Sequence, residues 1–184
     1  MRIQNRKYVA CALLGSMLLL LSVLASAVKN ENAEVSRLLQ EARDKAAVLS
    51  RDADEMEALT RSEVSWQSHA AMLDTMKDDV NGLAKTVEKL EAMRDSASPW
   101  QQQAIDRMVP MMRELASNTT AAINHLKDLQ TRPVSPEYAD YLRQNAETSK
   151  QLSDMISSVV EYDQTRAKLA QLEQKVETSS RASK

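Results

Sequence analysis

Apolar residues recur at alternating three- and four-residue intervals through most of the chain after residue 31, and polar or charged residues fill the positions between them. This is the spacing of one face of an α-helix. The pattern is interrupted near residues 60, 97 and 134. It therefore predicts four helices, over about residues 31–59, 62–96, 99–131 and 136–177. The polar residues 178–184 are expected to fray.

The repeating apolar positions of each predicted helix define the face expected to be buried. For the first three helices these positions are Val35, Leu38, Leu39, Ala42, Ala46, Leu49, Ala53, Met56 and Leu59; Trp66, His69, Leu73, Met76, Val80, Leu83, Val87 and Leu90; and Ile105, Met108, Met112, Leu115, Thr119, Ala122, Leu126 and Leu129. For the fourth they are Tyr138, Tyr141, Asn145, Thr148, Leu152, Met155, Val159, Tyr162, Leu169, Leu172 and Val176.

Local sequence signals mark where three of the helices begin. Ser-Pro pairs at 98–99 and 135–136 place a capping serine before a proline whose missing N–H costs nothing in the first turn. Residues 60–63, Thr-Arg-Ser-Glu, fit a capping box and predict a helix start near 62. Pro110 lies inside the third helix, where we expect a kink rather than a stop.

Composition and connection lengths turn these helices into a fold. Two glycines in 184 residues and an aromatic content of 3% disfavour strands and their turns. Long helices joined by connections of a few residues pack as antiparallel neighbours, and a period near 3.5 favours left-handed packing of knobs into holes. We therefore predict an all-α fold, an antiparallel up-down-up-down four-helix bundle with coiled-coil-like packing over residues 28–177.

The first 27 residues have the pattern of an export signal. Arg2, Arg6 and Lys7 precede 21 uncharged residues, and Ala25 and Ala27 supply the small residues that a signal peptidase accepts before Val28. The alternative is an uncleaved membrane anchor, since about 20 apolar residues span a bilayer. Either interpretation places the bundle outside the cytoplasm, periplasmic or secreted and most consistent with a bacterium, or tethered to the inner membrane with the bundle outside.

Charge and motifs exclude several functions. Residues 28–184 carry 21 basic and 26 acidic residues, a net charge of −5, which disfavours nucleic-acid binding. Cys11 is the sole cysteine and lies in the predicted signal. The chain has no nucleophile elbow, phosphate-binding loop or zinc-protease helix. We therefore predict no enzyme activity, no catalytic, cofactor-binding or metal residues, and no resident cofactor.

The two histidines are the main candidates for chemistry. If the second and third helices turn near residue 97, His69 and His125 lie at the same level of the bundle, near Tyr138 and Tyr141. Two imidazoles in one layer could bind a divalent metal or ligate haem. The alternative is a buried His69 hydrogen-bonded to a tyrosine or to the backbone, with His125 at the solvent boundary.

The fourth helix is longer than its partners. Counting back along the third helix places residue 168 level with the 95–98 turn, so Leu169, Leu172 and Val176 lie beyond it. They form either a docking surface or a cap over that turn and the mature N-terminus. We expect a non-enzymatic exported bundle that binds a protein, the envelope or its own copy through helical faces. The alternatives are the metal- or haem-binding bundle and a membrane-tethered spacer, and membrane contact is expected only if residues 1–27 are retained.

Overall fold

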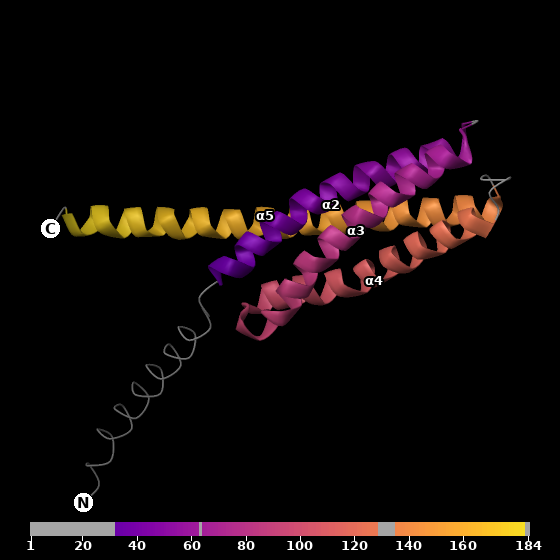
Figure 1. The fold of residues 1–184 in the computed structure, drawn as a ribbon. Helices are drawn as coiled ribbons and strands as arrows, with labels where there is room; N and C mark the ends of the chain where they lie inside the picture. The colour runs from indigo at the N-terminus through magenta and orange to yellow at the C-terminus, as the bar shows by residue number, and fades with distance from the viewer. Residues whose placement is uncertain (1–31, 63, 129–134, 183–184) are drawn as a thin grey trace, which may run out of the picture. The chain divides into compact units, whose positions relative to one another are not determined.

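The described part of the chain is all-helical. The structure is a computed structural model that describes residues 32–62, 64–128 and 135–182. Over these residues it consists of α2 (Ala33–Leu59), α3 (Trp66–Ala92), the short 3₁₀ turn η2 (Arg94–Ser96), α4 (Pro99–Asp128) and α5 (Pro136–Ala182), with no strand (Figure 1). The predicted all-α helical bundle is thus confirmed.

The helices pack in a cycle around one core. Helix α2 contacts α3 and α5, and α4 contacts the same two helices. The chain divides into two units after residue 31, and α2 to α5 belong to the second of them. The predicted signal segment and its cleavage residues Ala25, Ala27 and Val28 lie outside the described residues. None of the described helices combines the length and apolarity that crossing a membrane requires.

The buried faces of α2, α3 and α4 follow the predicted positions closely. Every predicted member from Val35 to Met56, from His69 to Leu90 and from Ile105 to Leu126 is buried. Leu59 and Trp66, at the two ends of the α2–α3 connection, are only partly buried. Leu129 lies outside the described residues.

Helix α5 follows its predicted face in its first half and departs from it afterwards. The predicted Tyr138, Asn145, Thr148 and Leu152 are buried, but Ile156, Val160 and Asp163 are buried in place of the predicted Met155, Val159 and Tyr162, which lie at the edge of the core or outside it. The predicted pattern shifts by one position because α5 carries apolar residues on two adjacent faces. One face is buried in the bundle, and the other continues beyond it.

The capping box predicted at Thr60 is wrong. Helix α3 begins at Trp66, and its N-cap is Ser65, whose hydroxyl accepts a hydrogen bond from Ser68 N at 3.3 Å. Thr60 instead ends α2, and its hydroxyl donates to the Glu57 carbonyl at 2.7 Å. A serine in extended conformation just before the apolar pattern supplies the cap that the Thr60 prediction placed five residues too early.

Both Ser-Pro pairs mark the start of a helix, as predicted, but the capping hydrogen bonds differ between the two. At α5 the Ser135 hydroxyl accepts from Tyr138 N at 3.2 Å, as predicted for an N-cap. At α4 the Gln101 carboxamide accepts from Ser98 N at 2.9 Å, which is one half of a capping box. Gln101 also donates to the Ser36 hydroxyl at 3.2 Å, so it joins the starts of α4 and α2.

The other helix ends differ by a few residues from the prediction. Helix α3 ends at Ala92, and η2 covers the last residues assigned to it. Helix α4 continues through Pro110, as expected, and is described to Asp128. Helix α5 continues to Ala182, so the fraying predicted from residue 178 does not occur over residues 178–182. There the Thr178 hydroxyl donates to the Gln174 carbonyl, a bond made within the helix.

Candidate functional site

One end of α5 extends past the rest of the helical unit. Tyr162 packs edge-to-face on Trp100, in the first turn of α4, with ring centroids 5.4 Å apart. Because α4 begins there, the residues of α5 after Asp163 have no α4 residue beside them. Side chains from 164 to 181 are exposed, apart from the half-buried Arg166. At about 1.5 Å per residue this projecting end of α5, residues 164–182, is about 28 Å long (Figure 1).

The projecting end carries three exposed apolar side chains on one stripe. Leu169 is 55% exposed, Leu172 49% and Val176 69%. They therefore do not pack over the 95–98 turn, and the mature N-terminus, which the same predicted alternative included, lies outside the described residues. The extension also starts about five residues earlier than predicted, at residue 164 rather than after residue 168, because Tyr162 already packs on Trp100 in the first turn of α4. We call these three residues with Tyr162 the α5 stripe.

A groove adjoins the inner end of the α5 stripe. It has a volume of about 530 Å³ and lies between α4 and α5, where Trp100, Met155, Val159 and Tyr162 line it. The Trp100 indole Nε1 is buried and has no hydrogen-bond partner among the described residues. The guanidinium of Arg166 lies 5.6 Å from the Tyr162 ring centroid, a cation–π distance. The groove and the stripe thus form one continuous, partly apolar surface.

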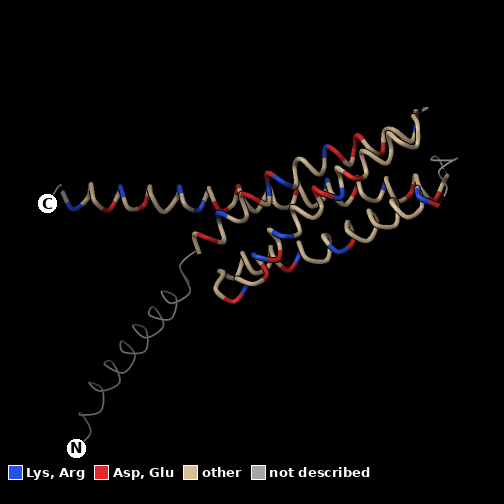
Figure 2. Tube along the Cα trace, in the orientation of Figure 1, with Lys and Arg blue, Asp and Glu red and all other residues tan. Residues whose placement is uncertain are grey.

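Charges of both signs surround this surface. Figure 2 shows basic and acidic residues alternating along the projecting end of α5. They include Lys168, Glu173, Lys175 and Glu177. A mixed rim around an apolar stripe is typical of a protein-binding helix, whereas a helix that lies on anionic lipid carries a mainly basic polar face.

The predicted histidine pair does meet at one level, through Tyr138. His69 Nδ1 is hydrogen-bonded to the Tyr138 hydroxyl at 3.2 Å. The His125 ring stacks on the Tyr138 ring, with centroids 6.0 Å apart. It meets the Tyr141 ring in a T-shaped arrangement, with centroids 6.2 Å apart. His125 Nε2 is hydrogen-bonded to the Ser135 hydroxyl at 2.6 Å. The register predicted from the hairpin is therefore correct to within one helical turn.

The surroundings of His69 and Tyr138 keep these two groups neutral. His69 and Tyr138 are fully buried, and His125 is half-buried. Burial lowers the pKa of His69 and raises the pKa of Tyr138, so both remain uncharged at neutral pH. His69 Nε2 has no hydrogen-bond partner among the described residues. This matches the alternative prediction of a buried histidine bonded to a tyrosine with a second at the solvent boundary.

A metal site would need more ligands than this cluster offers. One nitrogen of each imidazole is already bonded to a hydroxyl, and no group of three or more His, Cys, Asp or Glu side chains with metal-binding geometry occurs in the described ranges. The cluster instead joins α3, α4 and α5 at one end of the helical unit.

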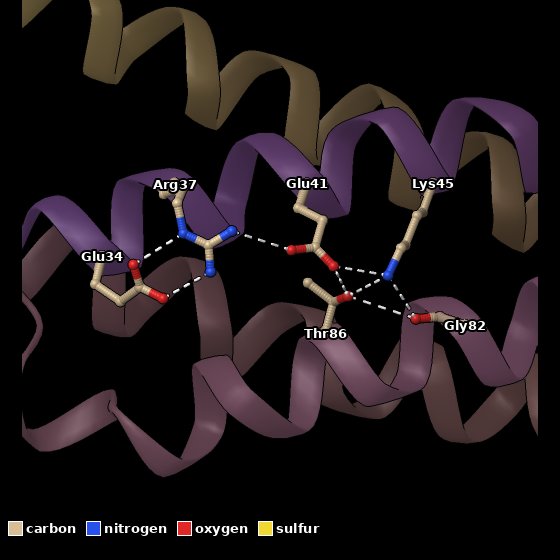
Figure 3. A network of polar contacts seen from close by, with 6 residues as sticks. All are labelled: Glu34, Arg37, Glu41, Lys45, Gly82 and Thr86. Carbon is tan, nitrogen blue, oxygen red and sulfur yellow. Dashed lines mark hydrogen bonds and ion pairs between the residues drawn. The ribbon is translucent and has the colours of Figure 1, made fainter.

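A polar network that sequence reasoning missed joins α2 to α3 (Figure 3). Lys45 Nζ donates to Glu41 Oε1 at 2.7 Å, to the Thr86 hydroxyl at 2.8 Å and to the Gly82 carbonyl at 3.2 Å. Glu41 also accepts a hydrogen bond from the Thr86 hydroxyl. The bonds that Glu41 accepts, first from Lys45 and then from Thr86, lower its pKa to about 2. The network satisfies its own charges and so stabilises the helix pair. The signal in the sequence that could have revealed this network is Thr86, a polar residue next to the apolar Val87 of the predicted face.

The comparisons with known proteins give no family. Searches against protein-family models, curated proteins and solved structures find no match for this chain. The functional assignment therefore depends on the surfaces and contacts described above.

Proposed function

We propose that this protein is an exported, non-enzymatic helical bundle that acts by binding another protein through the α5 stripe. The observation that carries the proposal is the exposure of Leu169, Leu172 and Val176, each about half exposed or more, on a helix end that projects past its neighbours. Three large apolar side chains aligned on one exposed helical stripe are typical of a docking helix.

The proposal includes a specific topology, an antiparallel up-down-up-down four-helix bundle with coiled-coil-like packing. Two observations support it. Each helix packs on the next one along the chain, and α5 also packs on α2, which is the neighbour pattern of such a bundle. The buried positions of α2 recur at three- and four-residue steps, the spacing of knobs-into-holes packing.

The proposed location depends on the first 27 residues. Their basic start, uncharged run and Ala25 and Ala27 before Val28 support export with cleavage at Val28. Fractionating cells that express the full gene and measuring the intact mass of the product tests this. A product that begins at Val28 in the periplasm or medium is expected. A full-length product in the membrane would make the bundle a tethered spacer instead.

A protein partner fits the α5 stripe better than a lipid surface does. Glu173 and Glu177 flank the stripe among the basic residues, and an anionic bilayer would repel both carboxylates. The metal- or haem-binding alternative has weaker support, because no group of three or more His, Cys, Asp or Glu side chains that could hold a metal ion occurs in the described part of the chain. Native mass measured before and after replacing both histidines with alanine tests that alternative.

Photo-crosslinking in cells tests the binding proposal. A benzophenone amino acid replaces Leu172 on the stripe, and in a matched variant it replaces the exposed Ala167 on the opposite side of the same helix end. Light is expected to join the Leu172 variant to a protein and to leave the Ala167 variant mostly unreacted. Equal and negligible crosslinking at both positions would overturn the proposal.

A further inference from the structure

The α5 stripe follows a heptad repeat. Tyr162, Leu169 and Val176 are seven residues apart and occupy the a positions. The intervening d positions are Thr165, Leu172 and Ser179. A repeat of this kind forms the contact seam of a two-stranded coiled coil, in which each helix supplies the same residues. The exposed seam therefore has the form of one half of a symmetric helix pair.

The seam continues into the helical unit without a break. Met155 is seven residues before Tyr162, so it also falls on an a position, and both residues line the groove beside Trp100. A second helix laid along the stripe would thus meet a partly apolar groove at its inner end, which Gln103, Arg107 and Ser158 line together with the apolar residues.

The charges beside the seam discriminate between parallel and antiparallel pairing of two copies. In a parallel pair, each g residue faces the e residue five positions later on the other helix. In this chain that rule pairs Lys168 with Glu173 of the other copy, and Glu161 with Arg166. Both combinations are opposite in sign, and twofold symmetry produces each of them twice.

An antiparallel pair would be less favourable. Aligning Leu169 with Leu172 of the other copy places Lys168 opposite Lys175, and symmetry repeats that repulsion. The attraction of Arg166 for Glu173 would remain. The pattern of charges on the seam edges thus favours the parallel, in-register arrangement.

We propose that the α5 stripe pairs with the same stripe of a second copy of this chain, as a parallel, in-register two-stranded coiled coil. This inference rests on the proposed protein-binding function and names its partner. The seam is short, with Leu169, Leu172 and Val176 as its central residues, and two of its d positions are polar. The dimer is accordingly expected to be weak and to depend on protein concentration.

Disulfide crosslinking tests the arrangement directly. Because Cys11 is the sole cysteine, a Cys11→Ser chain is free of thiols and accepts one new cysteine at a time. In a parallel pair, a cysteine from Leu172→Cys meets its own symmetry mate. The full gene is expressed, and its product is oxidised mildly without any further trimming of the chain. A disulfide-linked dimer is expected for Leu172→Cys and not for Ala167→Cys on the opposite side.

Charge variants provide a second test. Lys168→Glu faces Glu173 of the other copy in the parallel pair, so sedimentation equilibrium should show a dissociation constant at least about fivefold higher. Adding Glu173→Lys should restore the original value, because the pairs are then opposite in sign again. In an antiparallel pair Lys168→Glu would instead tighten binding to Lys175, and that result would overturn the inference.

The outcomes separate the inference from the proposed function. If Leu172→Cys gives no dimer while the benzophenone at the same position joins a different protein, self-pairing is overturned and protein binding stands. If neither probe reacts, both are overturned. A crosslink between Leu169→Cys in one copy and Leu172→Cys in the other, without the Leu172 homodimer, would overturn the parallel arrangement alone.

Discussion

Tyr138→Phe removes one hydroxyl from the buried cluster that joins α3, α4 and α5. Tyr138 and His69 are both fully buried, and their hydrogen bond is 3.2 Å long. Phenylalanine keeps the ring contacts with both histidines but leaves His69 Nδ1 without its partner. His69 Nε2 already lacks one among the described residues, so the imidazole would then be buried with both nitrogens unpaired.

The expected loss follows from that unpaired nitrogen. Leaving a buried polar group without its hydrogen bond costs about 1–3 kcal/mol of unfolding free energy. For a chain of this size, a loss of about 2 kcal/mol lowers Tm by about 4–8 °C. His69→Leu combined with Tyr138→Phe removes both partners, so the double variant should be less destabilised than the sum of the single ones.

Urea and thermal unfolding followed by circular dichroism measure these differences. The matched control is Tyr141→Phe, since Tyr141 is half-buried and its ring also lies beside His125, in a T-shaped arrangement. We expect the control to change the free energy by less than about 0.5 kcal/mol. Equal effects of Tyr138→Phe and Tyr141→Phe would refute the reasoning about the buried hydrogen bond.

Three further predictions concern stability. Burial lowers the pKa of His69. Its contribution to the free energy of unfolding is therefore complete above the pKa of the unfolded state, near 6.5, and is lost as the pH falls below that pKa. Urea titrations at pH 7 and pH 5 should show this loss, and His69→Leu should diminish it. Burial and the neighbouring Asp52 raise the pKa of Asp79, so Asp79→Asn should stabilise the protein at pH 7 and have little effect below about pH 4, where the unfolded carboxyl is also protonated. A Cβ at Gly82 would meet no atom within 4 Å, so Gly82→Ala should raise the unfolding free energy by about 1 kcal/mol, and a decrease would contradict the open space seen there.

The sequence predicted the fold well where one face of a helix holds nearly all the apolar residues. In α2 that face is unambiguous, and its members from Val35 to Met56 are all buried. In α5 the apolar residues occupy two adjacent faces, and periodicity cannot tell which face the other helices cover. The structure buries Ile156 and Val160 and leaves Leu169 and Val176 outside.

The candidate sites were predicted less evenly. Counting residues along the hairpin brought His69 and His125 to one level, because both belong to long regular helices. The same counting placed the start of the α5 extension about five residues too late, since small errors in loop length add up over two turns. The Trp100 groove could not be predicted, because it depends on how α4 and α5 approach each other.

Thiol labelling tests whether another protein covers the α5 stripe in the cell. In a Cys11→Ser chain, Leu172→Cys reports on the stripe and Ala167→Cys on the opposite side of the same helix end. A membrane-permeant maleimide is added to intact cells and, separately, to dilute purified protein. If a partner covers the stripe, Leu172→Cys is labelled several times more slowly in cells than in dilute solution, while Ala167→Cys reacts similarly in both. Equal labelling of Leu172→Cys in both settings would contradict it.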